Sequence, residues 1–231
     1  MGKIAVIHQP DFLPYLGFFH RFLQADLWVI LDNVQFIHKG SGWQHRDKIK
    51  TPIGEKWITI SVQKPKLGTP IKEVILSKDV DWRSNHLNLI KQNYRKAEFF
   101  NEIFPYIEEL YRFDCFKMVD FNLKSIKLLK NIFDIKIESV MASSLGGEGK
   151  NNELLADILL KAGAAIYLSG IGAKDYFKQE PFDKAKIKVM WQEFEHPVYP
   201  QLFGKFIPYL SSIDLLFNCG IKKSREILRR S

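Results

Sequence analysis

Side chains able to carry acid–base chemistry follow the apolar runs that we interpret as buried strands. His8 comes directly after the first run, Asp32 after the second and Ser169 after a later one. An imidazole can act as a general base, and a carboxylate can hold and orient a polar group of a substrate. The positions predict a site with His8 and Asp32 as catalytic candidates; for His8 the alternative is a hydrogen-bonded core histidine. Binding candidates beside the same strand ends are Gln9, Gln35, Ser169, Gly170 and Lys174.

The stretch Ser169-Gly170-Ile171-Gly172-Ala173-Lys174 is a short glycine-containing loop after a predicted strand. Glycines let backbone N–H groups approach a phosphate closely, and the lysine can neutralise its charge. The loop is shorter than a Walker A motif and lacks its Gly-Lys-Ser/Thr ending. A plain strand-to-helix turn is the alternative.

A dense polar and basic stretch runs from Gln44 to Lys50, and we take Gln44, Arg46 and Lys50 as substrate-binding candidates. The guanidinium of Arg46 can hold a phosphate or a carboxylate through two parallel hydrogen bonds. The alternative for this stretch is the solvated edge of a hairpin.

A proline-restrained loop near the C-terminus carries His196, Tyr199 and Gln201. We include His196 among the catalytic candidates and the other two among the binding candidates. Asp214 lies in an otherwise apolar helical stretch, where a buried carboxylate needs hydrogen-bond donors. It can hold a loop or a substrate amine, and a structural role is the alternative.

The sequence lacks the motifs of metal sites, of disulfide frameworks and of covalent hydrolases. His38 and His45 are irregularly spaced and no HExxH sequence accompanies them, so we predict no metal site. The two cysteines, Cys115 and Cys219, cannot form a disulfide framework, and we interpret them as buried free thiols. No GxSxG sequence exists, and covalent hydrolase chemistry has no support.

The elements that must position these residues alternate between short apolar runs and helical patterns, which predicts an α/β fold. We expect a mostly parallel Rossmann-like sheet with helices on both faces, in which ligands bind at the carboxyl ends of the strands. Predicted strands cover residues 4–7, 27–31, 135–140, 165–168 and 187–191, and predicted helices include 15–24, 151–161 and a basic final helix at 222–230 with a solvated end. Residues 143–149 form a predicted loop.

An insertion is predicted at about residues 44–133. It contains an antiparallel hairpin at 48–62, a further strand at 71–76 and helices within 82–133. We expect a single α/β domain over residues 1–231.

The chain has 34 Lys and Arg against 26 Asp and Glu among 231 residues, a formal net charge of +8. This surplus attracts polyanions and also suits small anionic substrates such as nucleotides. The N-terminal apolar run is too short for a signal peptide, and residues 162–173 fall short of the ~20 residues that span a bilayer. We expect a soluble cytoplasmic protein.

Several segments together resemble the WbqC-like family. They are Ile7-His8-Gln9-Pro10, Pro14 to Phe19, Ala25-Asp26, Leu31 to Phe36, Gln44 to Lys50, Tyr167 to Gly170, His196 to Gln201 and Ser211 to Gly220. The resemblance runs over nearly the whole chain. It implies a place in bacterial surface-polysaccharide (O-antigen-like) biosynthesis and transfer of glycine or a related acyl group to an amino sugar.

A second resemblance concerns the fold and is to nucleotidyl transferases of the pantothenate synthetase type. The strand, proline loop, helix and following Ala25-Asp26 pair are shared in outline. The HxGH signature of that group is absent, and Pro14-Tyr15-Leu16-Gly17 occupies the comparable place. ATP is the cofactor that this resemblance implies.

We therefore expect an acyl or aminoacyl transferase, or an amide ligase, acting on a nucleotide-linked amino sugar. His8 would be a base or a phosphate contact, Asp32 would orient the amine, and Arg46, Lys50 and Lys174 would hold phosphates. The alternatives are a non-catalytic nucleotide or sugar-phosphate binding protein and an RNA- or aminoacyl-tRNA-binding protein.

Overall fold

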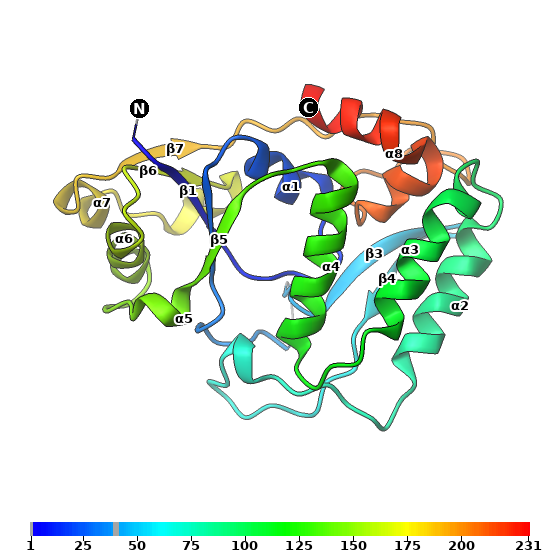
Figure 1. Ribbon diagram of the computed structural model, residues 1–231, viewed down its shortest axis with the longest axis horizontal. Helices are drawn as coiled ribbons and strands as arrows, with labels where there is room; N and C mark the ends of the chain where they lie inside the picture. The colour runs from blue at the N-terminus through cyan, green and yellow to red at the C-terminus, as the bar shows by residue number, and fades with distance from the viewer. Residues whose placement is uncertain (1, 39–41) are drawn as a thin grey trace.

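The computed structural model of the protein describes residues 2–38 and 42–231 and contains a five-stranded parallel sheet (Figure 1). Its strand order is β5-β2-β1-β6-β7, which confirms the Rossmann-like prediction. The strands are β1 (Ile4–His8), β2 (Leu27–Ile30), β5 (Glu138–Met141), β6 (Ile166–Ser169) and β7 (Lys188–Trp191). The chain steps to opposite sides of β1 when it forms β2 and β6, so the switch in strand order lies between β1 and β6. A crevice at their carboxyl ends is where such a fold binds ligands.

Helices cover both faces of the sheet because successive side chains of the strands point to opposite sides. In β1, Val6 belongs to one hydrophobic core and Ala5 and Ile7 belong to the other. The larger core takes in α1 (Leu16–Leu23), α4 (Met118–Phe133) and α8 (Ile213–Arg230). The smaller core takes in α5 (Ala142–Leu145), α6 (Asn152–Lys161) and α7 (Glu180–Lys184), seen on the left of Figure 1.

The predicted insertion lies between β2 and β5. It holds the antiparallel hairpin of β3 (Arg46–Thr51) and β4 (Gly54–Thr59), the short 3-10 helix η1 (Ile71–Glu73), and helices α2 (Trp82–Tyr94), α3 (Phe100–Arg112) and α4. Ile49, Ile58 and Ile107 of this segment belong to the larger core of the sheet. That shared core favours the single-domain interpretation, which stays a prediction.

Two predicted elements, at 71–76 and at 143–149, differ from the structure. The strand expected at 71–76 is wrong: η1 occupies its start, and only single bridges join Leu76 to Val62 and Ile75 to Lys117. The loop expected at 143–149 begins as the short helix α5. The predicted helical stretch around Asp214 and the predicted final helix at 222–230 both exist, and they form one kinked helix, α8, because Gly220 joins two helical pieces. A further 3-10 helix, η2 (Ile171–Tyr176), follows β6.

Two arginines of the basic C-terminal segment donate hydrogen bonds to carbonyls at the C-terminal end of α4. Arg225 Nε donates to the Ile132 carbonyl at 2.6 Å, and Arg229 Nη2 donates to the Phe133 carbonyl at 3.3 Å. Both carbonyls belong to the last turn of α4, which has no intrahelical donors for them. Arg225 and Arg229 therefore cap α4, and the prediction of a merely solvated helix end was incomplete.

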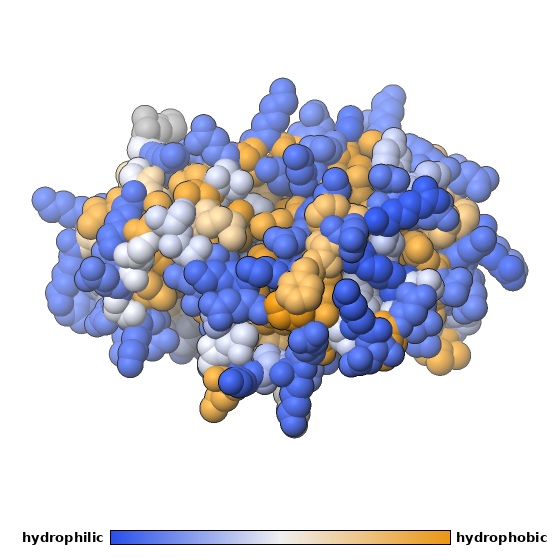
Figure 2. Space-filling model, turned by 60° about the horizontal axis from the view of Figure 1, so that its bottom comes forward, coloured by the Kyte–Doolittle hydropathy of each residue, from blue (hydrophilic) through white to orange (hydrophobic). Residues whose placement is uncertain are grey.

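Hydrophilic side chains dominate the face shown in Figure 2, with hydrophobic residues in small patches between them. None of the helices in the described part of the chain is long and apolar enough to span a lipid bilayer. Both cysteines are free; Cys219 is buried as predicted, whereas Cys115 is only half-buried.

We predict that Gly220→Ala lowers the free energy of unfolding by about 2 kcal/mol or more. Gly220 has φ +68° and ψ 174°, a conformation that side chains disfavour, and a Cβ there would lie 2.5 Å from the Phe99 ring. Gly172→Ala is the matched control because a Cβ at Gly172 meets nothing within 4 Å. Urea unfolding of both variants is the measurement, and equal midpoints would contradict the packing described for α8.

Candidate functional site

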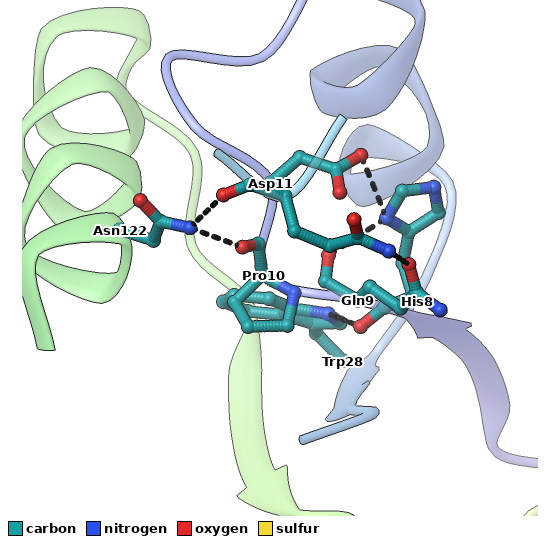
Figure 3. Close-up of polar contacts among 7 residues, drawn as sticks. His8, Gln9, Pro10, Asp11, Trp28 and Asn122 are labelled. Carbon is teal, nitrogen blue, oxygen red and sulfur yellow. Dashed lines mark hydrogen bonds and ion pairs between the residues drawn. The ribbon is translucent and has the colours of Figure 1, made fainter. Parts of the chain in front are cut away.

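The loop that follows β1 is held in one conformation by buried amide side chains (Figure 3). Asn122 Nδ2 of α4 donates to the Pro10 carbonyl at 2.7 Å and to the Gln44 carbonyl at 2.5 Å. The Gln44 side chain donates to Gln9 Oε1 at 2.5 Å, and Trp28 Nε1 donates to the His8 carbonyl at 3.2 Å. The predicted binding residues Gln9 and Gln44 are thus brought together, and together they fix the backbone beside His8.

His8 and Asp11 point toward one another at the carboxyl end of β1 (Figure 3). His8 Nδ1 lies 2.8 Å from the Gln9 carbonyl, so it carries the ring proton as a donor, and it is 3.6 Å from Asp11 Oδ2. The other ring nitrogen, Nε2, is then a free acceptor for a proton. The side chains keep 26% and 13% of their surfaces exposed, so solvent or a substrate can reach both.

The environment moves the pKa values of this pair in opposite directions. Burial, helped by the nearby Arg21 charge, lowers the pKa of His8 to about 3. Burial raises the pKa of Asp11 to about 7, although Arg21 opposes that rise. At neutral pH the imidazole is therefore neutral, and the carboxyl group is poised to take or give a proton, as acid–base catalysis requires.

Arg21 brings a buried positive charge to the same place. Its side chain starts on α1, and helical side chains point back toward the helix N-terminus, here toward the carboxyl ends of the strands. The residue is only 5% exposed. Its Nη1 lies 3.1 Å from the position that a Cβ would take at Gly170, directly after β6. The guanidinium thus lies at the carboxyl end of β6, and Gly170 leaves the space for it.

Asp32 has a structural position. Its Oδ1 accepts from the Ser143 backbone N–H at 2.9 Å, and its Oδ2 accepts from the Ser143 hydroxyl at 2.6 Å. These bonds tie the end of β2 to the start of α5, and Asp32 is fully buried. Its proposed role in orienting an amine stays a prediction, and its two oxygens are already engaged.

Four further predicted residues meet in one buried network. Asp214 accepts from the Tyr94 hydroxyl at 2.8 Å, the Tyr199 hydroxyl at 3.0 Å and Gln201 Nε2 at 2.8 Å. Lys50 Nζ donates to Gln201 Oε1 at 3.0 Å and to the Lys205 carbonyl at 2.6 Å. Lys50 and Asp214 are 1% and 0% exposed. The network connects β3, α2, the C-terminal loop and α8, and this is the structural alternative considered for Asp214.

His196 lies in an aromatic cluster that borders the crevice. Its ring centroid is 5.0 Å from that of Tyr209, which is 6.2 Å from that of Tyr15. Tyr15 feels the charges of Arg21 and Asp11, and burial raises the pKa of its hydroxyl. His196 is therefore connected to the site through two tyrosines, and its catalytic role stays a prediction.

No hydrogen bond or ion pair among the described residues joins the remaining candidates to His8 or Asp11. Arg46 covers the Trp57 ring at 4.4 Å on the hairpin, and Lys174 lies over the Trp191 ring at 5.4 Å. Gln35 is exposed, and Ser169 is buried. No bond among the described residues joins Arg46 or Lys174 to the His8 loop, so their phosphate contacts also stay predictions.

Sequence reasoning missed Asp11 and Arg21, together with their neighbours Tyr15, Asp47 and Asn122. Asp11 stands between Pro10 and Pro14 in the loop after the first strand, a position that could have identified it. Arg21 is a charged residue within an otherwise apolar helical stretch. For the buried Asp47, burial and the nearby Asp11 hold the pKa of the carboxyl well above its usual range.

A groove of about 1100 Å³ lies at the amino ends of the strands, opposite to His8. Its lining includes Lys3 before β1, Asp26 before β2 and Glu138 at the start of β5, with Lys127 and Lys130 of α4. Ligands of parallel sheets bind at the carboxyl ends, so we place the candidate site at His8 rather than in this groove. Within residues 2–38 and 42–231, no three His, Cys, Asp or Glu side chains gather in a metal-binding arrangement.

Comparison with known proteins finds a matching family model and a similar protein. The model of the WbqC-like protein family matches residues 9–226. The chain belongs to that family. It is also 32% identical over 226 residues to Rv1507c, an uncharacterized protein of Mycobacterium tuberculosis, with 95% of each chain covered. No solved structure matches, so the fold-level resemblance to pantothenate synthetase-type enzymes stays a prediction.

We predict that Asp214→Asn lowers the free energy of unfolding of this WbqC-like protein by about 3 kcal/mol. The amide presents a donor where the carboxylate accepted three hydrogen bonds, and the buried Lys50 loses its compensating charge. Asp175→Asn, at an exposed position of η2, is the control and should change little. If urea unfolding shows Asp214→Asn to be as stable as the wild type, the network is not structural.

Proposed function

We propose that the protein forms an amide bond between an activated acyl or aminoacyl group and the amine of a nucleotide-linked amino sugar. Membership of the WbqC-like family supports a role in polysaccharide biosynthesis. The observation that carries the reaction type is Asp11, a largely buried carboxyl group with a pKa of about 7 beside a neutral histidine. Amide formation needs such a base because an ammonium group has no lone pair for attack.

In the proposed reaction Asp11 removes a proton from the sugar ammonium group. The amine lone pair then forms a C–N bond to the acyl carbon. The bond from that carbon to its leaving group breaks, and the leaving group departs with the electron pair. The nitrogen then loses its second proton, to the departing group or to solvent, which leaves the neutral amide. The neutral Nε2 of His8 accepts a hydrogen bond from the amine and orients it, since Nδ1 is engaged by the Gln9 carbonyl.

The acyl donor must arrive as an ester, a thioester or a mixed anhydride, because a free carboxylate does not react with an amine without activation. ATP is the proposed cofactor where the protein makes the mixed anhydride itself, and an aminoacyl-tRNA would supply an ester. The crevice lies at the switch in strand order between β1 and β6, where nucleotide-binding α/β proteins hold their ligands. That location supports a nucleotide-linked acceptor.

We expect Asp11→Asn to reduce the rate of amide formation by about 10²-fold or more, since general bases contribute on that order. The wild-type kcat/KM should rise with pH through about 7 as Asp11 ionises, and His8 should stay neutral throughout that range. The measurement is mass spectrometry of mixtures containing the protein, ATP, glycine and a nucleotide-linked amino sugar, with preactivated glycyl and other acyl donors in parallel.

The control is Asp114→Asn, which removes an exposed carboxyl group and should leave the rate unchanged. Absence of an amide product with every donor would contradict the proposal. Stabilisation of the protein by the nucleotide without turnover would instead favour the non-catalytic binding alternative.

A further inference from the structure

Arg21 is a buried cation without a counter-ion among residues 2–38 and 42–231. It keeps 5% of its surface exposed, and its Nε is buried without a hydrogen-bond partner. In the described part of the chain no acceptor receives a hydrogen bond from its guanidinium, and no carboxylate lies within ion-pair distance. A buried charge left in this state costs free energy of folding, since it has lost its hydration and gained no partner.

Arg83 shows how this chain satisfies another arginine. Arg83 Nη1 donates to the Tyr111 carbonyl at 3.0 Å, and its guanidinium lies 4.7 Å from the centre of the Trp82 ring. The bonds hold Arg83 to the fold, and its charge has a structural use. Arg21 has no equivalent contacts among the described residues, so packing alone does not account for a charged side chain at that position.

The position of Arg21 points to a ligand. Its guanidinium lies between the end of β6, where Gly170 leaves room for Nη1, and the loop that carries His8 and Asp11. This is the switch in strand order, at which parallel α/β sheets bind their ligands. A guanidinium offers parallel N–H donors that match the two oxygens of a carboxylate or of a phosphodiester.

We infer that Arg21 is the anchor of an oxyanion-binding site at the carboxyl ends of β1 and β6, which takes a carboxylate or a phosphodiester group of the substrate. Its place in the reaction rests on the proposed function, because a sugar nucleotide carries phosphodiester-like oxygens and an amino-acid donor carries a carboxylate. The binding itself is measurable without turnover. The oxygens of the bound oxyanion accept hydrogen bonds from the Arg21 guanidinium, which has no acceptor among the described residues.

Occupation of this site changes the basicity of its neighbours. Five titratable groups feel the Arg21 charge, which acts to lower the pKa of each. They are His8 of β1, Asp11 of the following loop, Tyr15 before α1, His20 of α1 and Tyr167 of β6. A bound oxyanion offsets that positive charge, so the pKa values of His8 and Asp11 rise. Both groups become stronger bases when the substrate is in place.

Thermal unfolding tests the site. The wild type is compared with Arg21→Met and Arg83→Met in acetate, in dimethyl phosphate, and in sodium chloride at equal ionic strength. Without oxyanion we expect Arg21→Met to unfold at the same temperature as the wild type or higher, because an apolar side chain replaces an unpaired charge, and Arg83→Met to unfold at a lower temperature. An oxyanion should stabilise the wild type and Arg83→Met beyond the chloride control and should not stabilise Arg21→Met.

NMR titration of the His8 ring gives a second, local readout. We expect the oxyanion that stabilises the wild type to raise the His8 pKa, and we expect Arg21→Met to raise it without any oxyanion. Stabilisation by acetate alone assigns a carboxylate, by dimethyl phosphate alone a phosphodiester, and by both the shared oxyanion chemistry. The inference is wrong if neither oxyanion exceeds chloride, if Arg21→Met keeps the gain, or if the His8 pKa does not move.

These results are separable from those on the reaction. Amide formation without oxyanion-specific stabilisation would keep the proposed function and reject the Arg21 site. Oxyanion binding that depends on Arg21, with no amide product from any donor, would keep the site and reject the transferase.

Discussion

The burial of three ionisable side chains within one crevice is the constraint on which the site depends. Arg21 is buried, His8 and Asp11 are largely buried, and the Arg21 charge acts on the pKa of both. Burial disfavours the charged form of the histidine and of the carboxyl group, whereas the arginine stays charged. The result is a neutral imidazole, a carboxyl group that titrates near neutrality and a fixed cation, close to the switch point of a parallel sheet.

The rest of the fold holds this arrangement in place. The insertion between β2 and β5 supplies Asn122 and Gln44, whose amides fix the loop that carries Asp11. In the C-terminal segment, Asp214 of α8 accepts hydrogen bonds from Tyr94 of α2 and from Gln201 of the loop after β7. Residues distant in the sequence thus fix the conformation of the short loop after β1. The insertion therefore stabilises the candidate site.

The sequence predicted the parallel sheet, but it did not predict which ionisable side chains the fold buries together at the carboxyl ends of the strands. Periodicity identifies strands and helices because burial on one side of an element repeats at a fixed spacing, and strand ends then indicate the crevice. His8 was found in this way. Asp11 and Arg21 were missed because their importance arises from burial beside one another, and Asp11 lies in a loop while Arg21 lies on a helix face. Lys50 and Asp214 have charges that suggest ligand binding. In the fold both are buried and bind the Gln201 side chain, which accepts from Lys50 and donates to Asp214.

The central claim is that Asp11 titrates near neutrality under the influence of Arg21, and carboxyl carbon NMR can measure this group directly. In a sample with labelled aspartate, assigned through Asp11→Asn, we expect the Asp11 resonance to titrate with a pKa of about 7. In Arg21→Met it should titrate at a higher pH, because the nearby positive charge that favours the carboxylate is gone. An Asp11 pKa near the ordinary value of about 4, unchanged by Arg21→Met, would contradict the account.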